Sequence, residues 1–179
     1  PFVDGLALVV EEGKCGYVDP GGRFVIPMEL EAYPNVAASG DFRNGLAEVQ
    51  VGGKRCLINA RNERVLPCQF TDIGPATGSL IPVRKKGKWG YADRKGAVLF
   101  DNRYDMAWEM LNGMARVKNG EMFGVIDSAG KEVVAPRYNE INEVDHAYFQ
   151  IGTAAGKGLM DRKGKELIAP IYGSVSVMS

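Results

Sequence analysis

The chain has 179 residues, of which 45% are hydrophobic, and its 22 Lys and Arg residues balance its 22 Asp and Glu residues. This length and composition are typical of a globular protein that buries roughly 70% of its unfolded-chain surface. Because the net charge is zero, the overall field favours neither nucleic acid nor an anionic membrane as a partner. No apolar run approaches the roughly 20 residues that a membrane-spanning helix needs, so we expect no membrane insertion.

The cysteines Cys15, Cys56 and Cys68 are odd in number and include no CxxC pair. This pattern indicates neither a disulfide framework nor a zinc ribbon. We therefore predict reduced thiols, which favours a reducing cytoplasm. The chain starts at Pro1 without a Met, so a targeting segment removed earlier remains an open alternative.

Internal repetition is the strongest signal. One phrase recurs as "GKCGYVD", "GKRCLIN", "GKWGYAD", "EMFGVID" and "GKGLMD". Its copies are separated by 40 residues once and then by 34 residues three times, as measured at Gly16, Cys56, Gly90, Gly124 and Gly158. We predict a single domain over residues 1–179, divided into repeats 1 to 5 at approximately 2–40, 41–76, 77–110, 111–144 and 145–179.

Each repeat predicts three short antiparallel strands. In the first, "GLAEV", Ala47 and Val49 face one way and Glu48 the other. The second holds the recurring phrase, and the third is a run rich in β-branched residues. Proline follows that run in four copies, at Pro27, Pro67, Pro136 and Pro170. Because proline has no N–H to donate, we predict that it ends the pairing of the strand.

A turn of the type Asp-x-x-Gly is expected after the second strand. Asp93 and Gly96 stand at the first and fourth positions preferred in a type I turn, and the Asp side chain can accept a backbone N–H. Arg94 and Lys95 would then be solvated residues in the middle of the turn. The same device recurs at 19–22, 127–130 and 161–164, and with Asn at 59–62.

The glycine that recurs in the second strand has a structural reason, because a strand glycine lets another backbone or a ring come close. Ring-bearing residues stand fourteen positions later in four of the copies. We hypothesise that these rings fill the space above the glycine position, at Phe70, Tyr104, Tyr138 and Tyr172.

These features predict an all-β fold of five tandem three-stranded antiparallel repeats, in a twisted solenoid-like or barrel-like array. A closed β-propeller is the alternative. A repeat of 34 residues is short for a four-stranded propeller blade, which takes roughly 40 to 45.

The chain resembles the WG-repeat proteins, a bacterial family. The best matches are "GKWGYADRKG" at 87–96 and "FGVIDSAGKEVVAPRY" at 123–138, and the resemblance covers residues 2 to 173. The departures are Cys15, Arg55 and Lys157 at the Trp position, Cys56 at the Gly position, and Asp101 where a proline is expected. The resemblance implies a β-rich repeat architecture with a binding or scaffolding role, and it implies no shared catalytic residues.

The residues give little sign of catalysis. His146 is the only histidine and lies in the predicted loop "NEVDHAY", where a surface role is favoured. Each Asp-x-x-Gly turn supplies one carboxylate or amide, whereas calcium usually takes 6 to 8 oxygens. No phosphate-binding glycine loop precedes a helix. We therefore predict no enzyme, no cofactor and no metal site.

The stretch "RKKGKWGYADRKG" at 84–96 raises the alternative of nucleic-acid binding by stacking on Trp89 and Tyr91. Both residues stand at positions that recur in every repeat. The sites in the other copies that correspond to this stretch are acidic, neutral or aliphatic. A structural role is therefore favoured. Trp89, Tyr91 and Phe123 are kept as a second-ranked aromatic surface.

The segments that differ between copies are the first-ranked partner surface, because they are not needed to maintain the repeat. They are the six-residue insertion near Tyr33 and Asn35, and the connection that holds Trp108, Met110 and Leu111. We predict a non-catalytic protein-interaction or scaffold module whose partner is another protein. The alternatives are an immunity-type inhibitor of a toxin, a carbohydrate or cell-wall binding module, and an enzyme with an unrecognised site.

Overall fold

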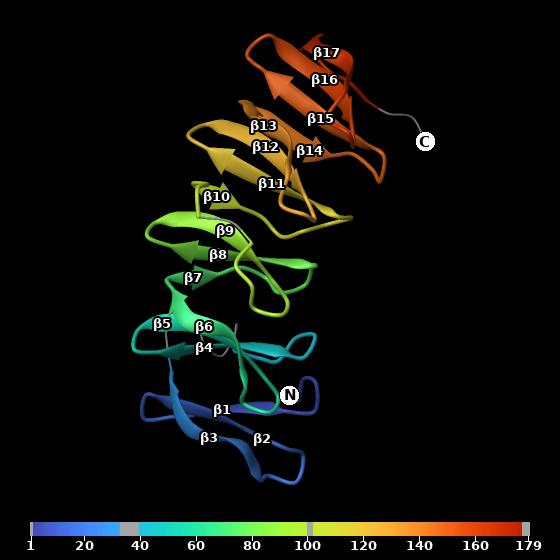
Figure 1. Ribbon diagram of the computed structural model, residues 1–179. Helices are drawn as coiled ribbons and strands as arrows, with labels where there is room; N and C mark the ends of the chain where they lie inside the picture. Colours follow the sequence, from blue (N-terminus) through green and yellow to red (C-terminus); the bar gives the residue numbers. More distant parts are fainter. Residues whose placement is uncertain (1, 33–39, 100–101, 177–179) are drawn as a thin grey trace. The chain divides into compact units, whose positions relative to one another are not determined.

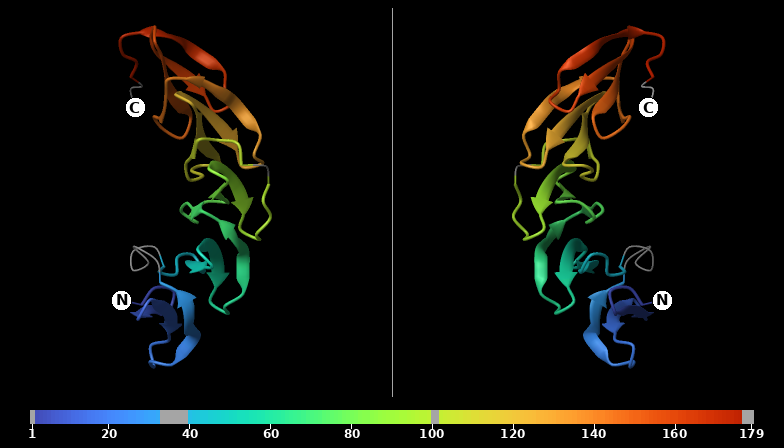
Figure 2. Two further views of the ribbon diagram at one scale, coloured as in Figure 1. Left: turned by 90° about the vertical axis from the view of Figure 1, so that its left-hand side faces the viewer. Right: turned by 90° about the vertical axis from the view of Figure 1, so that its right-hand side faces the viewer.

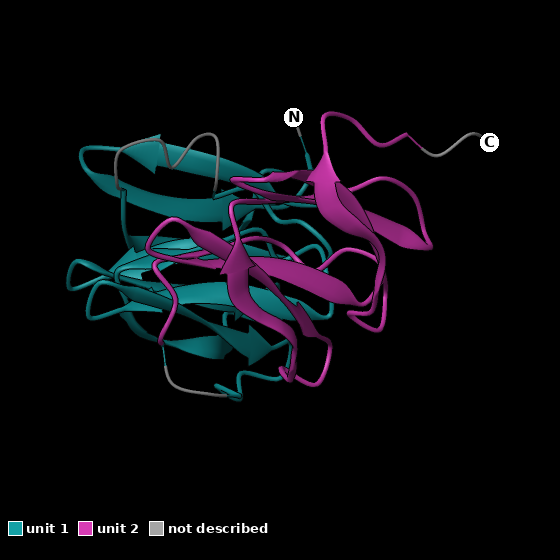
Figure 3. Ribbon diagram, turned by 90° about the horizontal axis from the view of Figure 1, so that it is seen from above, with its two compact units in different colours: residues 1–102 teal, residues 103–179 magenta. Residues whose placement is uncertain are grey.

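The computed structural model describes residues 2–32, 40–99 and 102–176. The chain forms two compact units, unit 1 at 1–102 and unit 2 at 103–179 (Figure 3). All regular elements of the described residues are β-strands, and every strand pairing is antiparallel. The predicted all-β fold of tandem antiparallel repeats is therefore confirmed.

Unit 1 holds a six-stranded sheet, formed by repeats 1 and 2, and a three-stranded sheet, formed by the end of repeat 2 and two strands of repeat 3 (Figure 1). Its strands are β1 (Ala7–Glu11), β2 (Lys14–Val18), β3 (Phe24–Glu31), β4 (Leu46–Val51), β5 (Lys54–Asn59), β6 (Arg64–Phe70), β7 (Asp72–Ile73), β8 (Leu80–Lys85) and β9 (Lys88–Asp93). In both sheets the strands lie in sequence order, as expected for successive hairpins.

Unit 2 holds two four-stranded sheets, which also keep the sequence order of their strands (Figure 2). The strands are β10 (Met106–Ala107), β11 (Met114–Asn119), β12 (Met122–Asp127), β13 (Glu132–Tyr138), β14 (Glu140–Glu143), β15 (Tyr148–Thr153), β16 (Gly156–Asp161) and β17 (Glu166–Tyr172).

The predicted alternation of the first strand is confirmed in β4. Ala47 and Val49 are each 1% exposed, whereas Glu48 between them is only half-buried. The buried columns of neighbouring repeats pack on one another, because a single hairpin has too little apolar area to form a core by itself. In unit 1 such a core cluster includes Leu57, Leu66, Phe70, Ile81, Val83 and Ala92.

Each sheet after the first begins with a short strand that three-stranded repeats do not require. The strands β7, β10 and β14 pair with β8, β11 and β15. They directly follow the column of ring-bearing residues, where the chain leaves one sheet and joins the next. After repeat 1 no separate short strand is formed at this point. Glu31, at the end of β3, pairs directly with Gln50 of β4.

The third strand of repeat 3 is the weakest of the five. In its described part, Val98 forms an isolated bridge with Ala92, and the N–H of Leu99 donates to the carbonyl of Tyr91 at 3.0 Å. Asn102 then donates its side-chain N–H groups to the carbonyl oxygens of Val83 and Lys88, at 2.6 and 3.0 Å. Asp101, which stands where the other copies suggest a proline, lies outside the described residues.

The predicted Asp-x-x-Gly turns are confirmed. In repeat 3 the Oδ1 atom of Asp93 accepts the backbone N–H groups of Lys95 and Ala97, at 2.8 and 2.9 Å. Asp19, Asn59, Asp127 and Asp161 make the equivalent pair of bonds in the other repeats.

Arg94, however, is not a solvated turn residue as predicted. Its guanidinium donates to the carbonyl oxygens of Ala76 and Asn44, at 2.5 and 2.8 Å, and so ties the turn of repeat 3 to repeat 2. Spacing along the sequence did not reveal that a long side chain at this turn reaches the preceding repeat. Lys95 is exposed, as predicted.

Two predictions about the glycine and proline columns are wrong. A Cβ atom on Gly124 would lie 2.6 Å from the carbonyl oxygen of Val134 and 2.8 Å from the nitrogen of Pro136, so the nearest atoms are backbone atoms and not those of an aromatic ring. Tyr138 instead pairs with Phe123, the residue before the glycine. The prolines do not end the third strands either, since each lies inside its strand beside a shift of register. A β-bulge tolerates proline because the N–H of the bulged residue is unpaired.

Candidate functional site

The structure describes only part of the first-ranked partner surface. Tyr33 and Asn35 lie outside the described residues. Trp108 is half-buried, and the side chain of Leu111 is 49% exposed. Met110 is only 4% exposed, so the prediction that it offers a contact surface is corrected: it packs into the core because the connection turns its side chain inward.

The connection from Trp108 to Met114 is fixed by backbone hydrogen bonds. The N–H of Trp108 donates to the carbonyl of Arg116 at 3.1 Å, and Leu111 and Met114 exchange two bonds across a tight turn. Asn112 and Gly113 occupy that turn with φ of 48° and 76°, which the two residue types tolerate best. The irregular sequence therefore has a defined conformation.

Trp108 forms one wall of a groove of about 290 Å³ in unit 2, which we call the Trp108 groove. The groove is lined by Trp108, Glu109, Leu111, Met114, Ala115, Arg116, Val125, Asn142, Glu143, Phe149 and Arg162. Its deepest residues are apolar, since Ala115, Val125 and Phe149 are at most 3% exposed. Charged side chains lie around this apolar floor.

Arg116 holds the Trp108 side of the groove. Its guanidinium lies 5.0 Å from the centre of the Trp108 ring and donates to the carbonyl of Ile141 at 2.8 Å. The rings of Trp108 and Phe123 are 5.7 Å apart. Because cation–π and ring contacts restrain a tryptophan, these contacts limit the orientations of the Trp108 side chain. The structure thus brings together Trp108 and Phe123, which the sequence assigned to two different surfaces.

Arg162 and Glu143 hold the opposite side. Arg162 donates to Oε1 of Glu143 at 2.7 Å and to the carbonyl of Asn112 at 3.0 Å, and its guanidinium lies 4.8 Å from the centre of the Phe149 ring. Burial acts to raise the pKa of Glu143. Hydrogen bonds from Asn112 and Arg162 outweigh this effect, so the pKa is lowered. This side chain therefore carries a negative charge at neutral pH.

The equivalent place in unit 1 has different chemistry. This Glu48 groove, of about 230 Å³, is lined by Asp41, Arg43, Leu46, Glu48, Leu57, Ile73, Gly74, Pro75, Ala76 and Thr77. Glu48 stands 68 residues before Arg116 and accepts a hydrogen bond from Arg55. Burial raises the pKa of Glu48, and the ion pair with Arg55 opposes that rise.

Of the three residues of the second-ranked aromatic surface, Trp89 and Phe123 are partly exposed and Tyr91 is not. Tyr91 is fully buried, so the prediction that it presents its ring to a partner is wrong. Its counterparts Leu57 and Val125, in repeats 2 and 4, are buried in core clusters. Trp89 and Phe123 are half-buried, and the Nζ atom of Lys118 lies 5.3 Å from the centre of the Phe123 ring.

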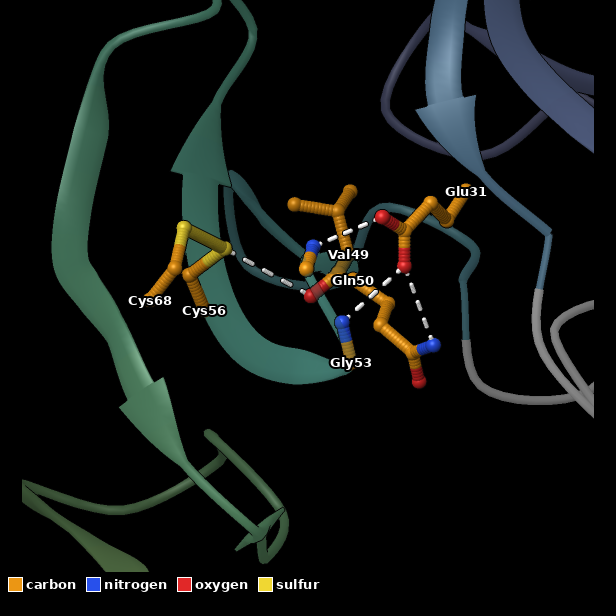
Figure 4. Close-up of a disulfide and its surroundings, with 7 residues drawn as sticks. Glu31, Val49, Gln50, Gly53, Cys56 and Cys68 are labelled. Carbon is orange, nitrogen blue, oxygen red and sulfur yellow. Dashed lines mark hydrogen bonds between the residues drawn. A yellow bond between two sulfur atoms is a disulfide. The ribbon is translucent and has the colours of Figure 1, made fainter.

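The prediction of three reduced thiols is also wrong, because Cys56 and Cys68 form a disulfide (Figure 4). Cys56 occupies the glycine position of β5, and Cys68 lies opposite it at the bulge of β6, so the two side chains meet where other repeats have no side chain on the second strand. Next to the disulfide, the carboxylate of Glu31 accepts the N–H of Gly53 (Figure 4). Cys15 keeps a buried thiol, whose pKa is raised by that burial.

In the part of the chain that the structure describes, no three His, Cys, Asp or Glu residues are grouped to hold a metal ion. His146 is exposed. Within the same residues, no helix is long and apolar enough to cross a membrane. The expected lack of catalysis, cofactor and metal remains a prediction.

Sequence reasoning missed most of the residues that build the Trp108 groove, among them Arg116, Asn142, Glu143, Phe149 and Arg162. A signal for them was present. Arg94 and Arg162 stand at the same turn position two repeats apart, each 50 residues after an Asn-Gly turn whose Asn carbonyl accepts its N–H. Comparing every second repeat, rather than consecutive ones, would have exposed this pattern.

The comparisons with known proteins concern the repeat itself. A family model described as "WG containing repeat" matches residues 16–54, 57–89, 89–122, 123–149 and 158–179. No curated protein matches the chain.

Ten chains of solved structures match. A structure titled as that of the eukaryotic initiation factor has a TM-score of 0.55 and 12% identity, over 94% of this chain and 52% of that one. Dihydro-heme d1 dehydrogenase NirN in complex with DHE has a TM-score of 0.44 and 15% identity, over 94% and 44%. A Bacteroides caccae protein of unknown function has a TM-score of 0.34 and 14% identity, over 92% and 77%. The chain spans about half the length of the first two. At these identities, the likeness to the first concerns the fold alone.

Proposed function

Since this chain belongs to the family of WG containing repeat proteins, with five matches along its length, we propose that it is a non-catalytic module that binds another protein. The repeat supplies a rigid frame whose turns and glycines serve the backbone. Binding is then left to the side chains that the frame does not need.

The observation that carries this proposal is the Trp108 groove. It combines an apolar floor, a half-buried tryptophan and a rim with both signs of charge. Such a site accepts an apolar side chain of a partner and pairs the polar groups around it, which is how central contacts of protein interfaces are built. The exposed side chain of Leu111 adds apolar area at the edge of the groove.

Protein binding accounts for the groove better than carbohydrate binding does. Sugars bind to tryptophan and phenylalanine by stacking on a ring face. Guanidinium groups lie over the rings of Trp108 and Phe149, at 5.0 and 4.8 Å, so a face of each ring is already occupied. The charged groups of Glu143 and Arg162 also suit a polypeptide, which offers charged side chains of both signs.

The test is binding by matched tryptophan variants. Partners would first be isolated from cells of the source with the intact chain and identified, and the affinity of the purified partner would then be measured by calorimetry. Trp108→Ala should weaken binding about 30-fold, since an anchoring tryptophan contributes about 2 kcal/mol. Trp89→Ala, the control in unit 1, should change it less than about threefold.

Two results would contradict the proposal. One is an unchanged affinity for Trp108→Ala together with loss of binding for Trp89→Ala, with both variants folded by circular dichroism. The other is binding of the chain to a glycan array that Trp108→Ala abolishes, which would replace the protein partner by a carbohydrate.

A further inference from the structure

The two-residue turn between the first and second strands of a repeat binds a carboxylate in repeats 2 and 4. In repeat 2, the carboxylate of Glu31 accepts the N–H of Gly53 at 3.1 Å (Figure 4) and the N–H of Gly52 at 2.6 Å. In repeat 4, Oδ2 of Asp105 accepts the N–H of Gly120 at 2.8 Å. The bonds from Gly53 and Gly52 lower the pKa of Glu31, so the turn stabilises the negative charge of its acceptor.

Both carboxylates stand at one position, directly after the ring-bearing column of the preceding repeat. Glu31 pairs with Gln50 on the first strand of repeat 2. The backbone N–H of Asp105 donates to the carbonyl of Lys118 at 2.9 Å, on the first strand of repeat 4. At the corresponding place before repeat 3, the N–H of Thr71 donates to the carbonyl of the first strand at 2.8 Å. Thr71 is therefore the counterpart of the two acidic residues.

The turn of repeat 3, formed by Lys86 and Gly87, receives no such carboxylate. The hydroxyl of Thr71 donates to the carbonyl of Arg84 at 3.2 Å. Among the residues that the structure describes, no side chain accepts the N–H of Lys86 or that of Gly87. Both turn residues are exposed, with φ of 52° and 80°.

In repeat 5 a hydroxyl of the first strand accepts a turn N–H. The hydroxyl of Thr153 accepts the N–H of Ala155 at 3.2 Å, while Asn139, the counterpart of Thr71, donates to Sδ of Met122 at 3.8 Å. The position of Thr153 is held in repeat 3 by a lysine, which has no acceptor atom. Repeat 1 has no preceding repeat in this sequence, so it offers no comparison.

Lysines gather at the turn of repeat 3. Lys85, Lys86 and Lys88 occupy three of the four positions 85–88. The same four positions hold one lysine in repeat 2, at 51–54, and none in repeats 4 and 5, at 119–122 and 153–156. The turn that lacks an acidic acceptor is therefore the one with the most positive charge.

A hollow of about 460 Å³ lies beside this turn. It is lined by Gln69, Phe70, Lys85, Lys86, Val98 and Asn102. Nζ of Lys85 donates to Oε1 of Gln69 at 2.6 Å, which fixes this lysine at the wall. Because both charged residues of the lining are lysines, the hollow favours a ligand with negative charge.

We propose that the turn of repeat 3 binds a side-chain carboxylate in an acidic segment of a partner polypeptide. This carboxylate takes the place that Glu31 has in repeat 2 and accepts the N–H groups of Lys86 and Gly87. Successive backbone N–H groups in such a turn form an anion-binding concavity, and bonds to a charged acceptor are stronger than bonds to a neutral one. The site lies in unit 1 and shares no residue with the Trp108 groove.

The test is a nuclear magnetic resonance titration of the isotope-labelled chain with a hexaglutamate peptide whose ends are acetylated and amidated. The peptide should move the amide proton signals of Lys86 and Gly87 downfield along a saturable curve. The signals of Gly52, Gly53 and Gly120 should move little, because these N–H groups already have carboxylate acceptors. A hexaglutamine peptide should cause no such shifts, and added salt should weaken the response to hexaglutamate.

Two variants test the assignment of the turn. Thr71→Glu supplies the carboxylate that Glu31 supplies in repeat 2, so it should shift the Lys86 and Gly87 signals without peptide and abolish their response to it. Lys86→Gly keeps the N–H groups and the left-handed backbone but removes one charge, so it should weaken the affinity about threefold at low salt. Both positions are exposed, so the circular dichroism should not change. Lys95→Ala, in another exposed turn, is the control that should keep the affinity.

The proposal is wrong if Lys86 and Gly87 do not respond to the peptide, or if Gly52 and Gly53 respond as strongly. It is also wrong if a folded Thr71→Glu chain responds as the unaltered chain does. A tighter response to inorganic phosphate than to hexaglutamate would assign the turn to phosphate groups instead.

The response is independent of the Trp108 groove, which lies in unit 2. Trp108→Ala should therefore leave the hexaglutamate titration unchanged. A failure of this site and a failure of the proposed protein-binding groove are distinguishable by that variant.

Discussion

The Glu48 groove of unit 1 and the Trp108 groove of unit 2 occupy the same place in their repeats, and their side chains differ. In unit 1 the outward residue of the first strand is Glu48, which pairs with Arg55. In unit 2 it is Arg116, which lies over the ring of Trp108 and donates to the carbonyl of Ile141. The position of Trp108 is taken in unit 1 by Gly40.

The difference shows at which positions the side chain can change while the backbone stays the same. In both units an arginine of the later Asp-x-x-Gly turn donates to the carbonyl of an Asn-Gly turn, from Arg94 to Asn44 and from Arg162 to Asn112. The frame is therefore the same in both units. The charge and the ring on the outward positions change without altering it, so binding chemistry can vary between repeats at little structural cost.

The glycine column gives a second contrast between the units. Unit 2 has Gly124, above which the backbone of β13 leaves no space for a Cβ atom. Unit 1 has Cys56 at this position, and its side chain is accepted because it is joined to Cys68. The second and third strands therefore approach closely in both units. In unit 2 the approach is possible because Gly124 has no side chain, and in unit 1 the side chain at this position is bonded to the third strand.

The largest effect is expected from filling the glycine position of unit 2. Gly124→Val should lower the free energy of unfolding by about 3 kcal/mol, because the new Cβ atom would lie 2.6 Å from a carbonyl oxygen and β12 and β13 would have to separate. Urea denaturation followed by Trp108 fluorescence, in a Trp89→Phe background, measures this effect. Lys95→Ala should change stability by less than about 0.5 kcal/mol. Equal effects of the two changes would refute the role given to the column.

The next effect tests the same position in unit 1. Cys56→Ser removes the disulfide and should lower the stability of unit 1 by about 2 kcal/mol, since a link between residues 12 apart restricts the unfolded chain. Trp89 fluorescence in a Trp108→Phe background reports on this unit. Cys15→Ser is the matched control that leaves the disulfide intact. A thiol assay that finds three free cysteines in the unaltered, unfolded protein would contradict the pairing itself.

Much of the fold could be predicted from the sequence, because its signals are local. The Asp-x-x-Gly turns and the alternation around Glu48 involve residues a few positions apart, and the repeat places them five times. The short strands β7, β10 and β14 could not be predicted, because they form only where one repeat meets the next. The proline prediction failed for a related reason: whether an absent N–H ends a strand depends on the partner strand, which here shifts register at that point.

The site was less predictable than the fold. Trp108 was found because it breaks the repeat, but Arg116 and Arg162 belong to regular columns and attracted no notice. Their function depends on distances between repeats, such as the 4.8 Å from Arg162 to the ring of Phe149. The Cys56–Cys68 disulfide was missed because counting cysteines gives an odd number, whereas the strand register decides which side chains meet.

Comparing the two turn arginines sharpens the contrast between the grooves. Arg162→Ala should lower the stability of unit 2 by about 2 kcal/mol, because it removes a bond to the Glu143 carboxylate, a bond to a carbonyl and the contact with Phe149. Arg94→Ala removes only two bonds to carbonyl oxygens and should cost unit 1 about 1 kcal/mol. The same two fluorescence backgrounds measure both changes. A larger loss for Arg94→Ala than for Arg162→Ala would contradict this ranking.

The smallest expected effect is a difference in pH dependence between the grooves. Burial raises the pKa of Glu48 above its unfolded value, and only its pairing with Arg55 opposes this shift. The folded state therefore binds the Glu48 proton more tightly than the unfolded state, so stability falls as pH rises from the ordinary glutamate pKa through the raised one. In unit 2 the same position holds an arginine and not a carboxylate, so no slope of this kind is expected from it.

Glu31 also contributes to the pH dependence of unit 1: hydrogen bonds from the backbone of Gly53 and Gly52 lower its pKa, so its contribution has the opposite sign and lies below the ordinary glutamate pKa. The contribution of Glu48 is therefore isolated by subtracting the profile of Glu48→Gln from that of the unaltered chain. With Trp89 fluorescence, the unaltered chain should lose stability relative to Glu48→Gln as pH increases through this window. A difference of the opposite sign would mean that the ion pair with Arg55 outweighs burial, and that Glu48 stabilises its groove by its charge as Arg116 does in unit 2.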